Sequence, residues 1–159
     1  MKYLSILFLF LSLNLYGQSF ECDTMDCPWT PINTTYSYLM IIDDCMFEVE
    51  YKCRYCEYSN SFDYLLANII PIDFDCPIFQ EEYLINKVQD MLVLSNACGF
   101  SPTSPDTCIT KYIVKKSCWY YDSLGYHPCI YQDSCCKHRY IVCIDSSNNR
   151  FIRSKTAVY

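Results

Sequence analysis

The clearest pattern in the chain is an alternation of apolar and charged residues between positions 45 and 55. A period of two is typical of a half-buried antiparallel strand, because successive side chains point to opposite faces of a sheet. Residues 34–42 before it are rich in Thr, Tyr and Ile, and Asp43 and Asp44 form a turn signal between the two segments. The pattern therefore predicts a β-hairpin. Its expected apolar face is Cys45, Phe47, Val49, Tyr51, Cys53 and Tyr55, and its polar face is Glu48, Glu50, Lys52 and Arg54.

The period then changes from that of a strand to that of a helix. Residues 64–72 form a third strand candidate, interrupted by Pro71. Pro77 suits a first helical turn and Gly99 suits a left-handed stop, so a helix of about 22 residues, roughly 33 Å long, is expected between them. Apolar positions within it fall in one stripe: Leu84, Ile85, Val88, Met91, Leu92 and Cys98.

Strand patterns return in the last third of the chain. Segments 107–121 and 136–144 are expected strands, 122–128 is an expected turn, and the basic segment 150–159 is expected either as an edge strand or as a free end. One helix among strands predicts an α+β domain, a disulfide-stabilised antiparallel sheet with one main helix packed on it.

The first 18 residues have the layout of a secretory signal peptide. Lys2 supplies a positive start, 4–15 is a nearly uninterrupted apolar run, and the run is shorter than the ~20 residues that a transmembrane helix needs. We therefore expect cleavage after residue 18, a single cysteine-rich domain over 19–159, and a secreted or periplasmic location without stable membrane insertion.

Thirteen cysteines lie after this leader. In an exported chain such a density indicates a disulfide framework. Cys76 and Cys98 would lie at opposite ends of the helix, so each should be bonded to the sheet or to a loop. Because the number is odd, one cysteine is free or bonded to another chain. Cys56 is the candidate, since its parity places it on the polar strand face, and a disulfide-linked homo-oligomer would follow. The candidates for intramolecular bonds are Cys22, Cys27, Cys45, Cys53, Cys76, Cys98, Cys108, Cys118, Cys129, Cys135, Cys136 and Cys143.

Composition narrows the classes of partner and cofactor. The formal net charge is −6, and loss of Lys2 with the leader makes it more negative, which disfavours nucleic acid as a partner. After the leader only Gly99 and Gly125 remain, too few for a phosphate-binding loop. We therefore expect no nucleotide cofactor.

Several short motifs allow an enzymatic interpretation, and each has a structural alternative. Cys53 and Cys56 have redox spacing, but on a strand they would point to opposite faces. They could join Cys135, Cys136 or His138 around zinc, although export favours disulfides. Asp73 and Asp75 could bind calcium, but Asp75 or Cys76 more simply caps the helix. His127 is expected in a turn, and His138 packed on a strand. We therefore expect no catalytic, metal or cofactor-binding residue.

The function expected on this basis is a secreted, disulfide-stabilised binding or structural module with an unknown extracellular macromolecule as partner. The alternatives are a thiol-redox or zinc-dependent secreted enzyme and a subunit of an extracellular assembly. Asn33 begins a glycosylation sequon. Aromatic residues expected in or near loops could form the contact surface. They are Trp29, Trp119, Tyr120, Tyr121, Tyr126 and Tyr131.

Overall fold

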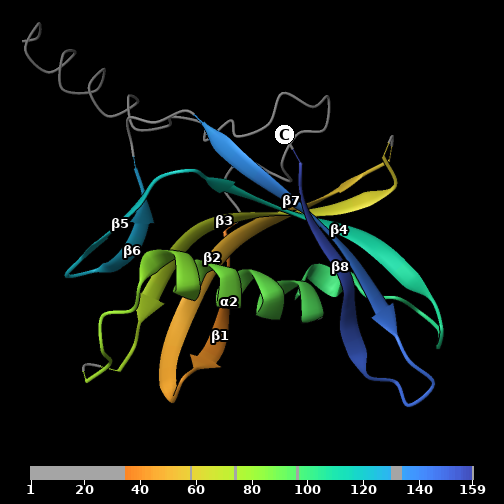
Figure 1. Cartoon of the computed structure of the whole chain (residues 1–159), viewed down its shortest axis with the longest axis horizontal. Coiled ribbons are helices and arrows are strands. Elements are labelled where there is room, and N and C mark those ends of the chain that lie inside the picture. The colour runs from red at the N-terminus through yellow and green to blue at the C-terminus, as the bar shows by residue number, and fades with distance from the viewer. Residues whose placement is uncertain (1–34, 58, 74, 96, 130–133, 159) are drawn as a thin grey trace, which may run out of the picture.

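The computed structural model describes residues 35–57, 59–73, 75–95, 97–129 and 134–158. The expectations for the leader, Cys22, Cys27, Trp29, Asn33 and Tyr131 lie outside these residues. The described part forms one eight-stranded sheet and one main helix (Figure 1). The elements are β1 (Tyr36–Ile42), β2 (Cys45–Cys56), β3 (Ser61–Pro71), α2 (Glu81–Leu94), the short 3₁₀ helix η2 (Ala97–Gly99), β4 (Cys108–Lys116), β5 (Trp119–Asp122), β6 (Gly125–Pro128), β7 (Cys135–Ile144) and β8 (Arg150–Val158).

The predicted hairpin is present as β1 and β2. These strands are antiparallel, with Ile42 opposite Cys45, so Asp43 and Asp44 form a two-residue connection. Both have positive φ, 48° and 65°. This combination is the one that a tight hairpin turn matching the twist of its strands requires, and Asp adopts it more readily than most residues.

The sheet is mixed, whereas an antiparallel sheet was expected. Its order is β1-β2-β3-β4-β7-β8, with the β5–β6 hairpin attached to β3, and β3 runs parallel to β4. The reason is α2, which lies between these two strands in the chain and returns it to the end of the sheet where β3 began. Such a crossover makes neighbouring strands parallel. The coarser expectation, a disulfide-stabilised α+β domain, is confirmed.

The segment between 107 and 128 differs from its prediction. The expected strand 107–121 is divided into β4 and β5 at Ser117 and Cys118, and the expected turn contains strand β6. Gly125 begins β6 with φ of 129°, and a Cβ there would stand 2.6 Å from the Ile69 carbonyl oxygen. The absence of a side chain therefore allows the β5–β6 hairpin to approach β3 closely.

Helix α2 is shorter than the predicted helix. It spans 14 residues, with Gln80 rather than Asp75 or Cys76 at the N-cap and no side-chain cap. Residues before it remain extended because the Tyr126 hydroxyl accepts a hydrogen bond from the Phe79 amide (2.7 Å) and donates one to the Phe79 carbonyl (3.1 Å). At the other end, the Ser95 hydroxyl donates to the Leu92 carbonyl at 2.7 Å and terminates the helix.

The core lies between α2 and the concave face of the sheet, which arches over the helix (Figure 1). Leu84, Val88, Leu92 and Val93 of the helix are fully buried there. From the strands, Phe47, Val49, Tyr64 and Ile113 are among the buried residues that meet them. No helix among the described residues is long and apolar enough to span a membrane.

The alternation in β2 changes near its end. Cys45, Phe47, Val49, Tyr51 and Cys53 are buried as expected, but Tyr55 is 44% exposed and Arg54 is 2% exposed. Arg54 is buried because Asp63 on β3, directly opposite, accepts its Nη2 hydrogen bond at 2.9 Å. At this end, therefore, both faces of the sheet contain buried side chains.

Four disulfides join pairs of described cysteines: Cys45–Cys76, Cys53–Cys98, Cys108–Cys143 and Cys118–Cys129. The prediction that Cys76 and Cys98 attach the two ends of the helical region to other elements is confirmed, since both are bonded to β2. The choice of Cys56 as the free thiol is wrong, because Cys56 is disulfide-bonded, as is Cys135. Among described residues Cys136 is the free cysteine, so its assignment to a disulfide is also wrong.

Candidate functional site

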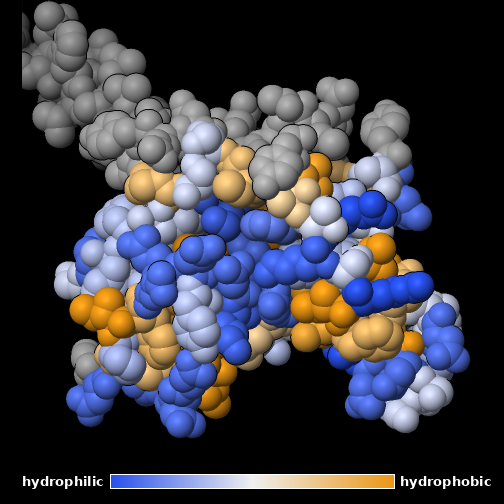
Figure 2. Space-filling model, in the orientation of Figure 1, coloured by the Kyte–Doolittle hydropathy of each residue, from blue (hydrophilic) through white to orange (hydrophobic). Residues whose placement is uncertain are grey.

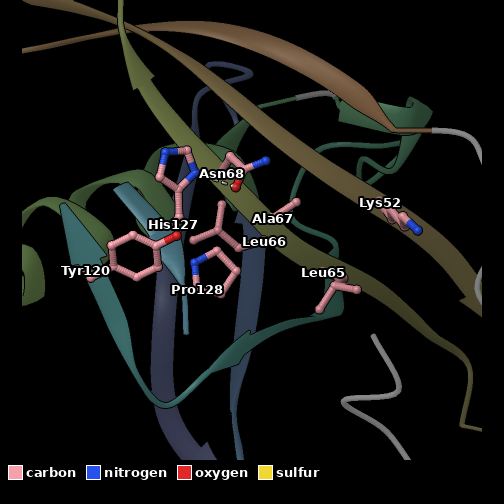
Figure 3. Close-up of a pocket in the computed structure, with 8 residues that line it drawn as sticks. All are labelled: Lys52, Leu65, Leu66, Ala67, Asn68, Tyr120, His127 and Pro128. Atoms are coloured by element: carbon pink, nitrogen blue, oxygen red, sulfur yellow. Dashed lines mark hydrogen bonds between the residues drawn. The ribbon is translucent and has the colours of Figure 1, made fainter. Parts of the chain in front are cut away.

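One hollow in the described part of the chain contains His127. It has a volume of about 250 Å³ and lies between β3 and the β5–β6 hairpin (Figure 3). Leu65, Leu66, Ala67, Pro128 and the Tyr120 ring supply most of its wall, and Asn68, His127 and Lys52 supply its polar atoms. The sequence placed His127 in a turn, but its backbone is part of β6.

One hydrogen bond and one close contact fix the orientation of the His127 ring. Its Nδ1 is hydrogen-bonded to Asn68 Oδ1 at 3.0 Å, and its Nε2 lies 3.3 Å from Asp122 Oδ1 without a hydrogen-bond partner among the described residues. The Asn68 amide nitrogen donates to Glu50, so the Asn68 oxygen is left to accept from Nδ1. The chain Glu50–Asn68–His127–Asp122 thus connects three strands, β2, β3 and β6, with the end of β5.

This arrangement suits structural attachment better than proton transfer. Both ring nitrogens face oxygen atoms of neighbouring residues, and a general base needs a nitrogen directed towards a substrate. Tyr120 is the one hydroxyl-bearing residue among the described residues lining the hollow, so no serine, threonine or cysteine stands beside the imidazole as a nucleophile. His127 therefore holds the β5–β6 hairpin against β3.

The second histidine, His138, is packed on β7 as the sequence indicated. It is partly buried, and its Nδ1 has no hydrogen-bond partner. Desolvation lowers the pKa of His138, and the nearby Lys155 and Lys115 lower it further, so the neutral form is favoured. In the part of the chain that the structure describes, no group of three His, Cys, Asp or Glu residues is placed to hold a metal ion. Asp73, one of the calcium candidates, accepts a hydrogen bond from the Met46 amide at 2.9 Å.

Of the four described residues in the expected aromatic contact surface, two are buried and two are exposed. Trp119 is 6% exposed, with its indole nitrogen donating to the Lys116 carbonyl, and Tyr126 is 1% exposed. Both belong to the core because β5 and β6 are strands rather than loops. Tyr120 and Tyr121 are each 39% exposed.

Large exposed apolar residues are instead concentrated on β1. Leu39 and Ile41 are 60% and 64% exposed, and Tyr36 and Tyr38 are about as exposed as Tyr120. The strand contains no charged residue and stands at one end of the strand order, so no described strand pairs with its outer edge. The sequence signal was available, because residues 36–42 are uninterrupted by charge, proline or glycine.

The exposed apolar edge of β1 is the basis for the function proposed below. Comparison with known proteins identifies no family: no protein-family model, no curated protein and no solved structure matches the chain.

Proposed function

We propose that residues 19–159 form an exported, disulfide-stabilised binding module that associates with another protein chain through the edge of β1. The observation that carries the proposal is the uncharged, exposed apolar character of this edge. The four disulfides are compatible with an extracellular or otherwise oxidising compartment.

An unprotected edge strand presents a row of backbone donors and acceptors to any extended segment that approaches. Proteins that avoid such pairing place charges, proline or bulges on the edge. The opposite edge, β8, has this protection: it contains Arg150, Arg153 and Lys155, and its pairing with β7 includes a register irregularity. Strand β1 has none of these devices, which favours it as the binding edge.

The occupant that fits β1 best is a second copy of β1. Two copies related by a two-fold axis through Leu39 would pair antiparallel, with Tyr36 of one opposite Ile42 of the other. Every facing pair would then be uncharged, and Asp43 and Asp44 would lie beyond the paired region. Self-association therefore brings no like charges opposite one another, despite the acidic net charge of the chain.

Sedimentation velocity tests this assignment. The wild type should show a dimer that increases with concentration, and Leu39→Lys should be monomeric because it places two ammonium groups on the axis. Leu39→Glu should be monomeric for the same reason, and an equimolar mixture of the two variants should associate again. Phe151→Lys is the matched control on β8, since Phe151 is also largely exposed (44%), and it should dimerise like the wild type.

A wild type that remains monomeric at all concentrations would overturn the proposal. So would a mixture of the Lys and Glu variants that fails to associate, because the two-fold pairing requires them to face each other. Loss of the dimer in Phe151→Lys with a dimer retained in Leu39→Lys would place the interface on β8 instead.

A further inference from the structure

A second hollow, separate from the outer edge of β1, lies at the C-terminal end of α2. It has a volume of about 650 Å³, within the range of small-molecule sites. The underside of the molecule is hollowed between its β1–β2 side and its β7–β8 side, with hydrophobic surface on both flanks (Figure 2). The lining residues are Tyr38, Met91, Leu94, Ser95, Ala97 and Arg150.

The wall of this groove is apolar apart from the Arg150 guanidinium and the hydroxyls of Tyr38 and Ser95. Met91, Leu94 and Ala97 belong to the end of α2 and the start of η2, and Tyr38 comes from the inner face of β1. No acidic residue is among the described residues that line it. Arg150, exposed at the start of β8, donates one long hydrogen bond, 3.4 Å from Nη1 to the Leu94 carbonyl, and has no ion pair with any described residue. A guanidinium has five N–H donors, so most of those on Arg150 remain available.

The helix end itself does not oppose an anion. The C-terminus of a helix carries partial negative charge on its last carbonyls. Here Lys111 donates from Nζ to the carbonyls of Val93 (2.7 Å) and Ser95 (3.3 Å), and it is fully buried. Lys111 thus satisfies two carbonyls at the helix end by hydrogen bonding from behind, while Arg150 faces the groove from the open side.

We propose that this groove binds a long-chain fatty acid. Its carboxylate would pair with the Arg150 guanidinium in the bidentate manner that suits both groups, and its alkyl chain would lie on Met91 and Leu94 with Tyr38 at the side. The combination of an unpaired arginine with an apolar, acid-free wall carries this inference. It goes beyond association through β1, since the groove opens on the inner face of that strand and the proposed dimer uses its outer edge.

Isothermal titration of the whole mature chain with sodium dodecanoate, below its micelle concentration, tests the site. Saturable binding of one dodecanoate per chain is expected. Butanoate should bind at least about tenfold more weakly because it buries far less alkyl surface, and dodecyltrimethylammonium should not compete because its charge is opposite. Arg150→Gln should weaken dodecanoate binding by about tenfold or more.

Arg153→Gln is the matched control, because Arg153 is an exposed cation of the same strand and is not part of the groove. It should change the affinity less than about twofold, as an exposed charge outside the site acts weakly through solvent. Met91→Glu provides a second variant that changes the wall and leaves Arg150 in place, and it should also weaken binding.

The inference fails if the wild type shows no saturable dodecanoate binding, if the cationic detergent competes, or if Arg153→Gln weakens binding as much as Arg150→Gln. Sedimentation velocity of the same samples shows whether dimerisation through β1 is retained, so failure of dodecanoate binding and failure of dimerisation can be distinguished.

Discussion

At the scale of single residues, Asp63 is a position where substitution should strongly destabilise the fold. Its side chain is 1% exposed, and it accepts hydrogen bonds from Arg54 and from the Ser61 hydroxyl (3.0 Å), with Lys137 Nζ at 3.7 Å. A buried ion pair contributes little net stability, but removing one partner leaves the other charge buried without compensation. The fold therefore depends on the Asp63 side chain as the partner of Arg54.

Asp63→Asn should accordingly lower the free energy of unfolding by about 3–5 kcal/mol. Asp90→Asn is the matched control, because Asp90 forms a pair with Lys155 at 2.8 Å in which the two side chains are 42% and 29% exposed. An exposed pair of this kind is worth ~1 kcal/mol or less. Urea unfolding with intact disulfides measures both, and equal losses would contradict the assignment of Asp63 as the buried partner.

Lys111 gives a pH dependence of stability. Burial lowers the pKa of Lys111 to about 7 from 10.5, and Arg150 adds to the shift. The unfolded chain then binds more protons than the folded chain between these two values, so folding becomes more favourable as the pH rises through this window. Relative to Lys111→Met, the wild type should gain up to about 1.4 kcal/mol per pH unit between pH 7.5 and 9.5.

The quantity to compare is the change in the free energy of unfolding between pH 7.5 and pH 9.5. Lys111→Met also loses two hydrogen bonds to helix carbonyls, but this loss lowers stability equally at the two pH values and does not affect the change. Cys136 is alkylated in both proteins to prevent disulfide exchange at high pH. Parallel pH profiles for wild type and variant would show that Lys111 titrates normally in the folded state.

At the scale of elements, local patterns predicted the hairpin and the existence of the helix. The pair Asp43–Asp44 and the alternation from Cys45 to Cys53 act over a few residues, and local chemistry decides them. The ends of α2 were not predictable in the same way. The hydroxyl of Tyr126, which is distant in sequence, keeps Phe79 extended. No property of residues 77–80 predicts that contact.

The parallel pairing of β3 with β4 and the burial of Arg54 have the same origin. Both depend on which strands become neighbours, and a single strand pattern contains no information on that. The candidate surfaces show a similar division. The uncharged run 36–42 is visible in the sequence, whereas the groove unites Tyr38 with Arg150, which only the folded arrangement brings together. The sequence does show that charge is divided unequally between its two parts, which contribute Tyr38 and Arg150 to the groove. Residues 19–107 contain fifteen acidic and three basic side chains, and residues 108–159 contain three acidic and eight basic ones.

The disulfide that attaches the end of the helical region to β2 and the disulfide that closes the β5–β6 hairpin should differ in their contribution to stability. Cys53 and Cys98 are 45 positions apart, and Cys118 and Cys129 are 11 apart. In the chain-entropy account, the longer loop restricts the unfolded state more, by about 1 kcal/mol. The double variant Cys53→Ala/Cys98→Ala should therefore lose more stability than Cys118→Ala/Cys129→Ala in guanidinium unfolding. The reverse order would mean that native contacts around the β5–β6 hairpin outweigh loop entropy.

At the scale of the whole molecule, the two features that could join one chain to another lie far apart in the sheet. Strand β1 is at one end of the strand order, and Cys136 is on β7, next to the opposite end. Dimerisation through β1 therefore does not bring the two Cys136 thiols together. An edge-strand dimer and a disulfide-linked dimer are separable predictions, and the structure favours the first.

Non-reducing electrophoresis of the alkylated protein should consequently show a monomer under conditions where sedimentation shows a dimer. Mass spectrometry after alkylation in denaturant should find one modified thiol per chain, and none in Cys136→Ser, because Cys136 is the free cysteine in the described structure. The Cys136→Ser variant should sediment as the wild type does. A covalent dimer that disappears in this variant would show instead that Cys136 is the link between chains, and that the exposed edge of β1 serves a different partner.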